Sequence, residues 1–461
     1  MSIRALSGEG QRGDRGAMTV TAGALAAATP ATRDRYVDLL RVASLGTVIA
    51  GHWLMAAVSR DGMGNLLALV PGLQWLTWVF QIMPVFFFVG GFSHALSYRS
   101  LARRCDGPVH AAFLRARLRR LLRPTLVFVL LWAAAALAVQ LAGRGAGGLT
   151  AAALRLVTQP LWFIGIYLAM VLLTPPLLKL HERYGWAAFA GLAGAAALVD
   201  VLRFALAVPY AQFLNFAFVW LAVHQLGFLR ADGRIRRPAA LALAGAGLAS
   251  ALLLVAVGPY PLSMVGMPGE KVSNMAPPTL ALLCHGMWLV GAVQLLARPA
   301  TAWLARPRVW RGVVAANGVA MTAFLWHLTA MLGVYGLQLA LGPDLPAPAT
   351  AAWWAQVPVR ILLATALTAL LVGVFRRFEA PGRPAGPGAA PGNGPLAAAG
   401  TVLCLLGVLG LSTTGLGGLL DGHSATLIAF PVTAPAAIGM AVAGALLVER
   451  SGPARRVRLR G

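Results

Sequence analysis

Twelve hydrophobic runs, each long enough to cross a bilayer as a helix, constrain this chain more than any other feature of its sequence. The runs lie at 38–58, 75–97, 124–142, 160–178, 185–202, 210–229, 238–257, 278–297, 313–340, 355–375, 395–418 and 425–448. A bilayer core needs about 20 apolar residues in a helix. Charged residues make up 11% of the chain, against about 25% in soluble domains. We therefore expect an all-α, polytopic transmembrane helix bundle whose surroundings are the lipid bilayer.

The basic residues predict how the bundle is oriented. Of the 38 Lys and Arg residues, 31 fall on one side of the membrane and 5 on the other, and Arg41 and Arg360 lie inside runs. Cytoplasmic loops carry the excess of Lys and Arg, so we expect both termini in the cytoplasm. The net charge of +24 does not indicate nucleic-acid binding, because the basic residues form short clusters between hydrophobic runs.

Composition also divides the chain into segments. We expect a disordered cytoplasmic tail at 1–32, a ten-span membrane domain at 33–381, a Pro/Gly-rich linker at 382–394, two additional helices at 395–448 and a basic cytoplasmic tail at 449–461. The two additional helices contain no strongly charged residue at depth, which predicts an appended hairpin outside any site. The three cysteines are far apart and form no CxxC pair, so we expect no metal site and no disulfide.

The first run carries an acid, a base and an imidazole. Arg41 and His52 are eleven residues apart, so they share one helix face about 16 Å apart along the axis, and Asp38 lies one turn before Arg41. A charged group inside a span costs about 2.5–3.5 kcal/mol on insertion scales and is a functional candidate by default. The alternative is a basic anchor with a satisfied core histidine.

A second intramembrane histidine is expected at a similar depth. His327 lies 16 residues past Arg311, and His52 lies 17 residues past Arg35. The two imidazoles would meet if their helices were neighbours. A lone histidine in a span is more often a group that hydrogen-bonds two helices.

The longest basic connection repeats arginine at helical spacing. Arg115, Arg119 and Arg123 follow one another at i, i+4, with Arg120 beside them. Guanidinium groups pair bidentately with phosphate, so this cluster is a candidate phosphate clamp. A positive-inside anchor explains the same pattern equally well.

Six landmarks in this order resemble the acyltransferase-3 family of integral membrane acyltransferases, over roughly residues 33–381. They are Arg41-x10-His52, Pro84-Val-Phe-Phe-Phe-Val-Gly-Gly-Phe92, Arg119-Arg120-Leu-Leu-Arg123-Pro124, Leu161-Trp162-Phe163, Leu325-Trp326-His327 and Phe378-Glu379-Ala-Pro381. The segment Val223–Phe228 is similar to an actinobacterial branch of the family. Some members end in an extracytoplasmic hydrolase-like domain, which this sequence does not show.

The resemblance implies acyl transfer, commonly acetyl, from cytoplasmic acyl-CoA to a hydroxyl of a carbohydrate or other cell-envelope or secreted acceptor. Acyl-CoA (acetyl-CoA) would be a co-substrate, with no permanently bound cofactor, and the location would be the bacterial cytoplasmic membrane. The family's catalytic histidine would be His52 and its partner Arg41, next to Asp38.

The remaining landmarks supply a second set of candidate site residues. These are His327, Trp162, His94 and Glu379. Many family members carry a Glu a few residues after the tryptophan of the fourth run. No carboxylate follows Trp162 at that distance in this chain.

The expected mechanism uses His52 as general base on the acceptor hydroxyl. The inside arginines would hold the phosphates of the donor, and Arg41 or His327 would supply an oxyanion donor. Direct transfer and an acyl-histidine relay are both open.

Two other functions are compatible with parts of the sequence. One is a 12-span secondary transporter. It is disfavoured because the segment from Arg99 to Arg123 lacks a Gly-x-x-x-Asp-Arg-x-Gly signature and the two halves show no sequence echo. The other is a catalytically silent family member, which the missing carboxylate in the fourth run keeps open.

Overall fold

The computed structural model describes residues 22–27, 29–30, 33–59, 62–105, 107–143, 148–267, 269–342, 345–379 and 392–452. Most of the predicted tails and of the Pro/Gly-rich linker lies outside these residues.

Within the described residues the chain is built almost entirely from helices. They are α1 (Ala22–Ala27), α2 (Arg35–Met55), α3 (Leu66–Leu69), α4 (Thr77–Phe80), α5 (Met83–Ala102), α6 (His110–Leu141), α7 (Gly148–Leu156), α8 (Leu161–Tyr184), α9 (Trp186–Phe204), α10 (Asn215–Ala231), α11 (Arg237–Val257), α12 (Leu280–Leu295), α13 (Ala297–Leu304), α14 (Pro307–Asn317), α15 (Ala320–Leu341), α16 (Ala351–Phe375), α17 (Gly394–Thr414) and α18 (Ala434–Arg450). Short 3-10 turns lie at η1 (Pro71–Leu76), η2 (Ala211–Leu214) and η3 (Arg376–Glu379). Two antiparallel hairpins pair β1 (Ala56–Ser59) with β2 (Gly62–Asn65) and β3 (Ser424–Leu427) with β4 (Phe430–Thr433).

This architecture is that of a polytopic membrane protein. A helix occupies each of the twelve predicted runs. In the described part of the chain, nine helical stretches are long and apolar enough to cross a membrane, and a tenth is the bent pair α12–α13. Helices α2 and α18, which occupy the other two predicted runs, are not both long enough and apolar enough to be counted with these spans. The first carries charged residues near its start, and the second is 17 residues long.

Three predicted runs were wrong at their starts, and proline accounts for two of the differences. The run 75–97 is broken between α4 and α5 because Pro84, at the start of α5, has no N–H and its ring blocks a continuous helix. The run 425–448 starts with the β3–β4 hairpin, which contains Pro431, and α18 begins next to Pro435.

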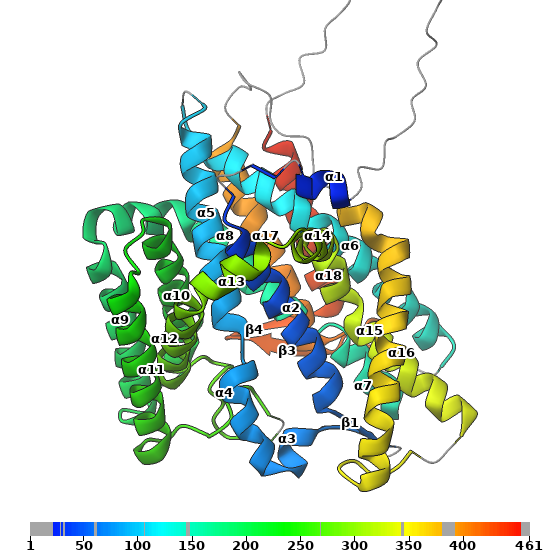
Figure 1. Cartoon of the computed structure of the whole chain (residues 1–461). Coiled ribbons are helices and arrows are strands. Elements are labelled where there is room, and N and C mark those ends of the chain that lie inside the picture. The colour runs from blue at the N-terminus through cyan, green and yellow to red at the C-terminus, as the bar shows by residue number, and fades with distance from the viewer. Residues whose placement is uncertain are drawn as a thin grey trace, which may run out of the picture.

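The third difference lies in the run 313–340, which divides between α14 and α15. Asn317 closes the break, because its side-chain amide donates to the Asp38 carbonyl at 3.1 Å and to the Val313 carbonyl at 3.1 Å. Figure 1 shows α14 end-on, lying across the bundle. This contact ties the end of α14, just before α15, to the first turn of α2.

Helix α2 crosses the front of the bundle in Figure 1, between α5 and α15. Helices α9 to α12 form one flank, and α16 covers α15 on the other (Figure 1). We call the end that carries α1, α13, α14 and the start of α2 the basic end. The opposite end, with the β1–β2 hairpin, α3 and α4, is called the hairpin end (Figure 1).

Two glycines let α5 and α10 cross at backbone contact. A Cβ on Gly91 would collide with the His224 carbonyl of α10, and a Cβ on Gly227 would collide with the Phe88 carbonyl of α5. Small residues permit this kind of close helix crossing in membranes. The crossing places His94, one turn past Gly91, beside α10.

The predicted appended hairpin is packed into the bundle. Helix α17 lies against α8, α6 and α18, and the space beside Gly165 of α8 is filled by Leu409 of α17. Gly400 and Gly407 of α17 meet the backbone of α18 directly. Helices α17 and α18 therefore pack against the rest of the bundle as well as against each other.

Candidate active site

His52 and His327 lie against each other where α2 passes α15. Their ring nitrogens, Nδ1 of His52 and Nε2 of His327, are 2.7 Å apart, and the rings are nearly parallel at 9° with centroids 5.0 Å apart. The Trp53 indole donates to the His327 carbonyl at 3.0 Å and holds the two helices in this register. The structure thus brings together the two histidines that counting placed at one depth.

Hydrogen-bond partners decide the tautomers of this pair. His327 Nδ1 lies 2.5 Å from the Phe324 carbonyl, which only accepts, so this nitrogen carries a proton. In the neutral ring its Nε2 is then an acceptor, and it receives the Nδ1–H of His52. The Nε2 atom of His52 keeps its lone pair, and no described group hydrogen-bonds to it. His52 is half-buried, whereas His327 is fully buried. The arrangement presents an oriented base.

Asp38 and Arg41 form a separate polar cluster toward the basic end. The buried Asp38 carboxylate accepts from Arg33 at 2.6 Å and from Arg41 at 3.0 Å. Arg41 also donates to the Ser93 hydroxyl at 2.9 Å. No hydrogen bond joins Arg41 to His52 among the described residues, so the two predicted catalytic groups occupy different places on α2.

Arg117 completes that cluster. It donates to the Ser93 carbonyl at 2.9 Å and to the Ser97 hydroxyl, and it is in no ion pair within the described chain. Two guanidinium groups, of Arg41 and Arg117, therefore converge on Ser93. Sequence reasoning missed Arg117 because it followed the arginines at i, i+4. The signal was the buried stripe Phe113-x3-Arg117-x3-Leu121, in which an arginine replaces an apolar residue.

Only some of the arginines of the predicted phosphate clamp are free to bind a phosphate. Arg119 forms an ion pair with Glu449 of α18, with its Nε 2.8 Å from Oε1. Arg120 and Arg123 are exposed, and Arg115 lies beside Gly452.

His94 belongs to a second histidine pair, which is fully buried. Its Nδ1 lies 3.1 Å from Nε2 of His224, and its Nε2 lies 2.9 Å from the Tyr167 hydroxyl. Tyr167 comes five residues after Trp162, from the stretch that lacks a carboxylate. His224 belongs to the segment Val223–Phe228, which was described only by its resemblance to a branch of the family. His94 meets His224 where α5 crosses α10, and it meets Tyr167 because α8 also packs against α5, and no local sequence pattern displays either contact.

A row of aromatic rings runs from one histidine pair to the other. Successive ring centroids are 5.1 Å from His94 to Tyr167, 6.1 Å to Phe86, 4.8 Å to Phe163, 4.8 Å to Phe324 and 5.6 Å to His327. Trp162 lies at the side of this row, against Phe163 and Trp220. Trp162 thus packs against the row, and no described contact joins it to either histidine pair.

Glu379 stands at the N-terminus of α15. Its buried carboxylate accepts from the backbone N–H groups of Met321 at 3.1 Å and Thr322 at 2.9 Å, and from the Thr322 hydroxyl at 2.6 Å. These are N–H groups without partners inside the helix. Glu379 therefore holds the helix that carries His327 and does not touch the histidine.

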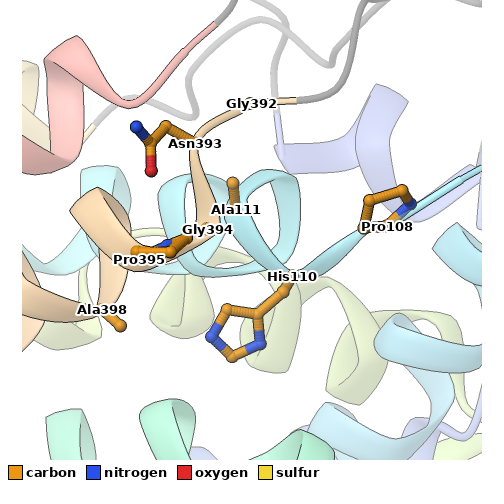
Figure 2. A pocket seen from close by; sticks show the side chains of 8 residues that line it. All are labelled: Pro108, His110, Ala111, Gly392, Asn393, Gly394, Pro395 and Ala398. Atoms are coloured by element: carbon orange, nitrogen blue, oxygen red, sulfur yellow. The ribbon is translucent and has the colours of Figure 1, made fainter.

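One hollow lies apart from these groups. It has a volume of about 560 Å³ and lies between the start of α6 and the start of α17. Figure 2 shows its lining, in which His110 and Ala111 face Asn393, Pro395 and Ala398. It opens at the basic end, away from His52. Within the described residues, no group of three or more His, Cys, Asp or Glu side chains is placed to hold a metal.

Comparison with known families decides what kind of protein this is. A family model described as an acyltransferase domain, that of the acyltransferase-3 family, matches residues 34–375. The chain belongs to the acyltransferase-3 family. No curated protein and no solved structure matches it.

Membership of the acyltransferase-3 family makes this chain a membrane acyltransferase. The transporter hypothesis is therefore wrong. The matched region includes both histidine pairs, Arg41, Arg117 and α15. It ends four residues before Glu379 and excludes α17 and α18.

Proposed function

We propose that this acyltransferase moves an acyl group, acetyl in the simplest case, from cytoplasmic acyl-CoA to a hydroxyl of a carbohydrate or other cell-envelope or secreted acceptor. His52 is the general base. The observation that carries the proposal is the hydrogen bond between His52 Nδ1 and His327 Nε2, because it leaves the other nitrogen of His52 unprotonated and fixed in direction.

The reaction follows from that tautomer. As the acceptor oxygen attacks the thioester carbonyl, its proton passes to Nε2 of His52. A C–O bond forms, and the C–S bond breaks when the tetrahedral intermediate collapses. The proton on His52 then passes to the departing CoA thiolate, which restores the neutral ring.

His327 has a supporting role in this scheme. When His52 becomes an imidazolium, its Nδ1–H bond to His327 strengthens, because hydrogen bonds from charged donors are about twice as strong as neutral ones. The bond of His327 to Phe324 keeps its acceptor nitrogen directed at His52.

The donor is proposed to enter from the basic end. The excess of Lys and Arg at that end supports a cytoplasmic location for it. Arg41 and Arg117 lie there, and Arg117 has no carboxylate partner within the described residues, which suits it to the phosphates of CoA. The extended pantetheine arm would carry the thioester from this cluster toward His52.

The test is a gene deletion complemented with wild-type or variant chains, followed by mass profiling of envelope glycans and secreted metabolites. We expect the deletion to lose one acyl mass and the wild type to restore it. His52→Ala should restore none of it at normal protein level, and His327→Ala should reduce transfer by about 10- to 1000-fold. His110→Ala, a histidine change in the hollow of Figure 2, is the matched control and should restore it fully.

Two results would overturn the proposal. One is full restoration by His52→Ala. The other is a deletion without any acyl change in which the wild type also transfers no acyl group from acetyl-CoA, which would establish the catalytically silent alternative.

A further inference from the structure

Helices α13 and α14 leave the direction of the spans at the basic end of the bundle. Helix α12, which precedes them, has 16 residues and rises about 24 Å, most of the ~30 Å thickness of a hydrocarbon core. The chain then bends by 51° into α13, and α14 lies across the bundle (Figure 1). We call residues 297–317, which contain the two helices, the elbow. Because it follows a span of this length, the elbow lies near the membrane surface.

The inner side of the elbow is fixed to the rest of the bundle. Leu304 of α13 and Trp310 and Val313 of α14 are buried. The Arg35 guanidinium, at the start of α2, lies 5.0 Å from the centroid of the Trp310 ring. Since these contacts hold one side of each helix, the residues on the other side are the ones that meet the surroundings.

The exposed side of the elbow is positively charged. Four arginines there are exposed and form no ion pair with any residue that the structure describes: Arg298, Arg306, Arg308 and Arg311. Arg308 and Arg311 lie about one turn apart on α14, so they share a face. The sequence contains no Asp or Glu from 271 to 343. The elbow therefore has no acidic residue of its own to neutralise these charges.

Several other arginines of the chain already have carboxylate partners. These pairs are Arg33 and Arg41 with Asp38, Arg99 with Glu182 and Asp232, Arg119 with Glu449, and Arg230 with Asp34. The arginines of the elbow differ from them, because an anion that neutralises the elbow has to come from outside the described chain.

Two large apolar side chains are exposed beside these charges. Leu296, at the bend, is 58% exposed, and Trp303 of α13 is 45% exposed. Such side chains are unfavourable in water, whereas tryptophan and arginine are both at home where the hydrocarbon core meets the headgroups. Interfacial helices combine arginine with apolar residues in this way, and they are attracted to anionic lipids. The combination favours a lipid surface over a soluble acidic partner.

We propose that the elbow binds the headgroups of anionic phospholipids. Its four exposed arginines pair with the lipid phosphates, since guanidinium groups bind phosphate bidentately, and Trp303 lies at the level of the headgroups. This surface is separate from the proposed donor cluster and from the histidine pair. Because α14 packs on α2 and leads into α15, bound lipid also steadies the end from which both histidine-bearing helices start.

The test identifies the lipids that lie against the elbow. The full-length chain carries Ala302→p-benzoylphenylalanine, a photoreactive residue at an exposed position of α13, in phosphatidylcholine vesicles with a minor proportion of phosphatidylglycerol. Mass spectrometry after irradiation gives the ratio of the two lipid adducts. We expect phosphatidylglycerol adducts at least about threefold above that lipid's share of the vesicle, since each basic residue near a surface strengthens its binding up to about fivefold.

Matched variants locate the effect. Arg308→Gln combined with Arg311→Gln should reduce the enrichment at position 302 by half or more, and so should high salt, which shortens the screening length. Arg103→Gln combined with Arg104→Gln, an equal loss of charge at two other exposed arginines, should leave it unchanged. The photoreactive residue placed instead at Ala102, next to that second pair, should show less enrichment. His52→Ala should give the wild-type ratio, so the result does not depend on acyl transfer.

Four results would overturn the inference. They are adducts in proportion to the vesicle composition, an unchanged ratio when Arg308 and Arg311 are replaced, equal enrichment at Ala102, and loss of the lipid adducts when acetyl-CoA is added. Equal enrichment would mean a diffuse attraction to all the arginines. Loss on adding acetyl-CoA would mean that the elbow binds the acyl donor. Adducts to a second copy of the chain in place of lipid would also refute it, because another subunit would then cover the elbow.

Discussion

Glu379 and Thr322 are joined by two hydrogen bonds, one from the backbone N–H and one from the side-chain hydroxyl of Thr322 to the same carboxylate oxygen. Together with the bond from Met321, they close the first turn of the helix that carries His327. A landmark that resembled part of a catalytic motif is thus a helix cap that lies 52 residues after the histidine it supports.

We predict that Glu379→Ala destabilises the protein by about 1–3 kcal/mol, because three donors lose their buried acceptor. Thermal unfolding in detergent measures the change. The control is Glu182→Ala, which removes a half-exposed carboxylate 3.3 Å from Arg99 and should cost less. Equal unfolding temperatures for Glu379→Ala and the wild type would contradict the assigned role.

Asp232 provides a pH dependence outside the spans. Its carboxylate accepts from Arg99 at 2.5 Å and from His181 at 2.8 Å. Burial alone would raise the pKa of Asp232, but the hydrogen bonds from Arg99 and His181 outweigh it and lower this pKa. The unfolded chain therefore binds this proton more readily. The stabilisation is complete above the unfolded value, about 3.9, and is lost as the pH falls through the folded value.

We predict that the unfolding temperatures of the wild type and Asp232→Asn differ by a constant amount between about pH 7 and 5, and converge below about pH 4. Thermal scans across this range measure the difference. Asp421→Asn, at an exposed aspartate, should show no such convergence. A wild-type advantage that grows toward low pH would refute the assignment.

Arg117 and Arg119 should differ in their effect on the donor. We predict that Arg117→Gln raises KM for acyl-CoA at least about tenfold, since it removes a charge with no carboxylate partner in the described chain. Arg119→Gln should change it less than about threefold, because Glu449 already engages that side chain. Initial rates at varied acyl-CoA give both values. A larger increase in KM for Arg119→Gln than for Arg117→Gln would instead indicate that the phosphates bind at the exposed arginines around Arg119.

The α5–α10 crossing should not tolerate a methyl group. We predict that Gly227→Ala loses more than about 2 kcal/mol of stability, because its Cβ would meet the backbone of α5. Gly194→Ala on α9 has open space and should be neutral or slightly stabilising. Expression and thermal unfolding compare the two, and a stable Gly227→Ala protein would mean that the helices separate easily.

Hydrophobic runs and arginine clusters were sufficient to predict the helical bundle and the depth of the two histidines. Depth follows from counting residues along one helix, so the sequence alone predicts that His52 and His327 lie at one level. Which helices are neighbours depends on close crossings such as Gly91 with Gly227. Those contacts are set by packing between distant segments, which hydropathy does not record.

The partners of the charged groups could not be predicted for the same reason. Arg119 was interpreted as a phosphate ligand, but its carboxylate partner lies 330 residues away in α18. Arg360 was recognised only as an arginine inside a run. Its contacts with Gln338 of α15 and with the Trp353 ring, from an earlier turn of its own helix, appear only in the structure.

The row of aromatic rings between the two histidine pairs also has an electrical consequence. Tyr167 and His327 are separated by Phe86, Phe163 and Phe324, whose rings carry no exchangeable hydrogen. None of these three rings can pass a proton, so the row itself is not a proton relay between His327 and Tyr167. Along this route the two histidine pairs are separate proton-binding units, because each can hold a proton without passing it to the other through the rings.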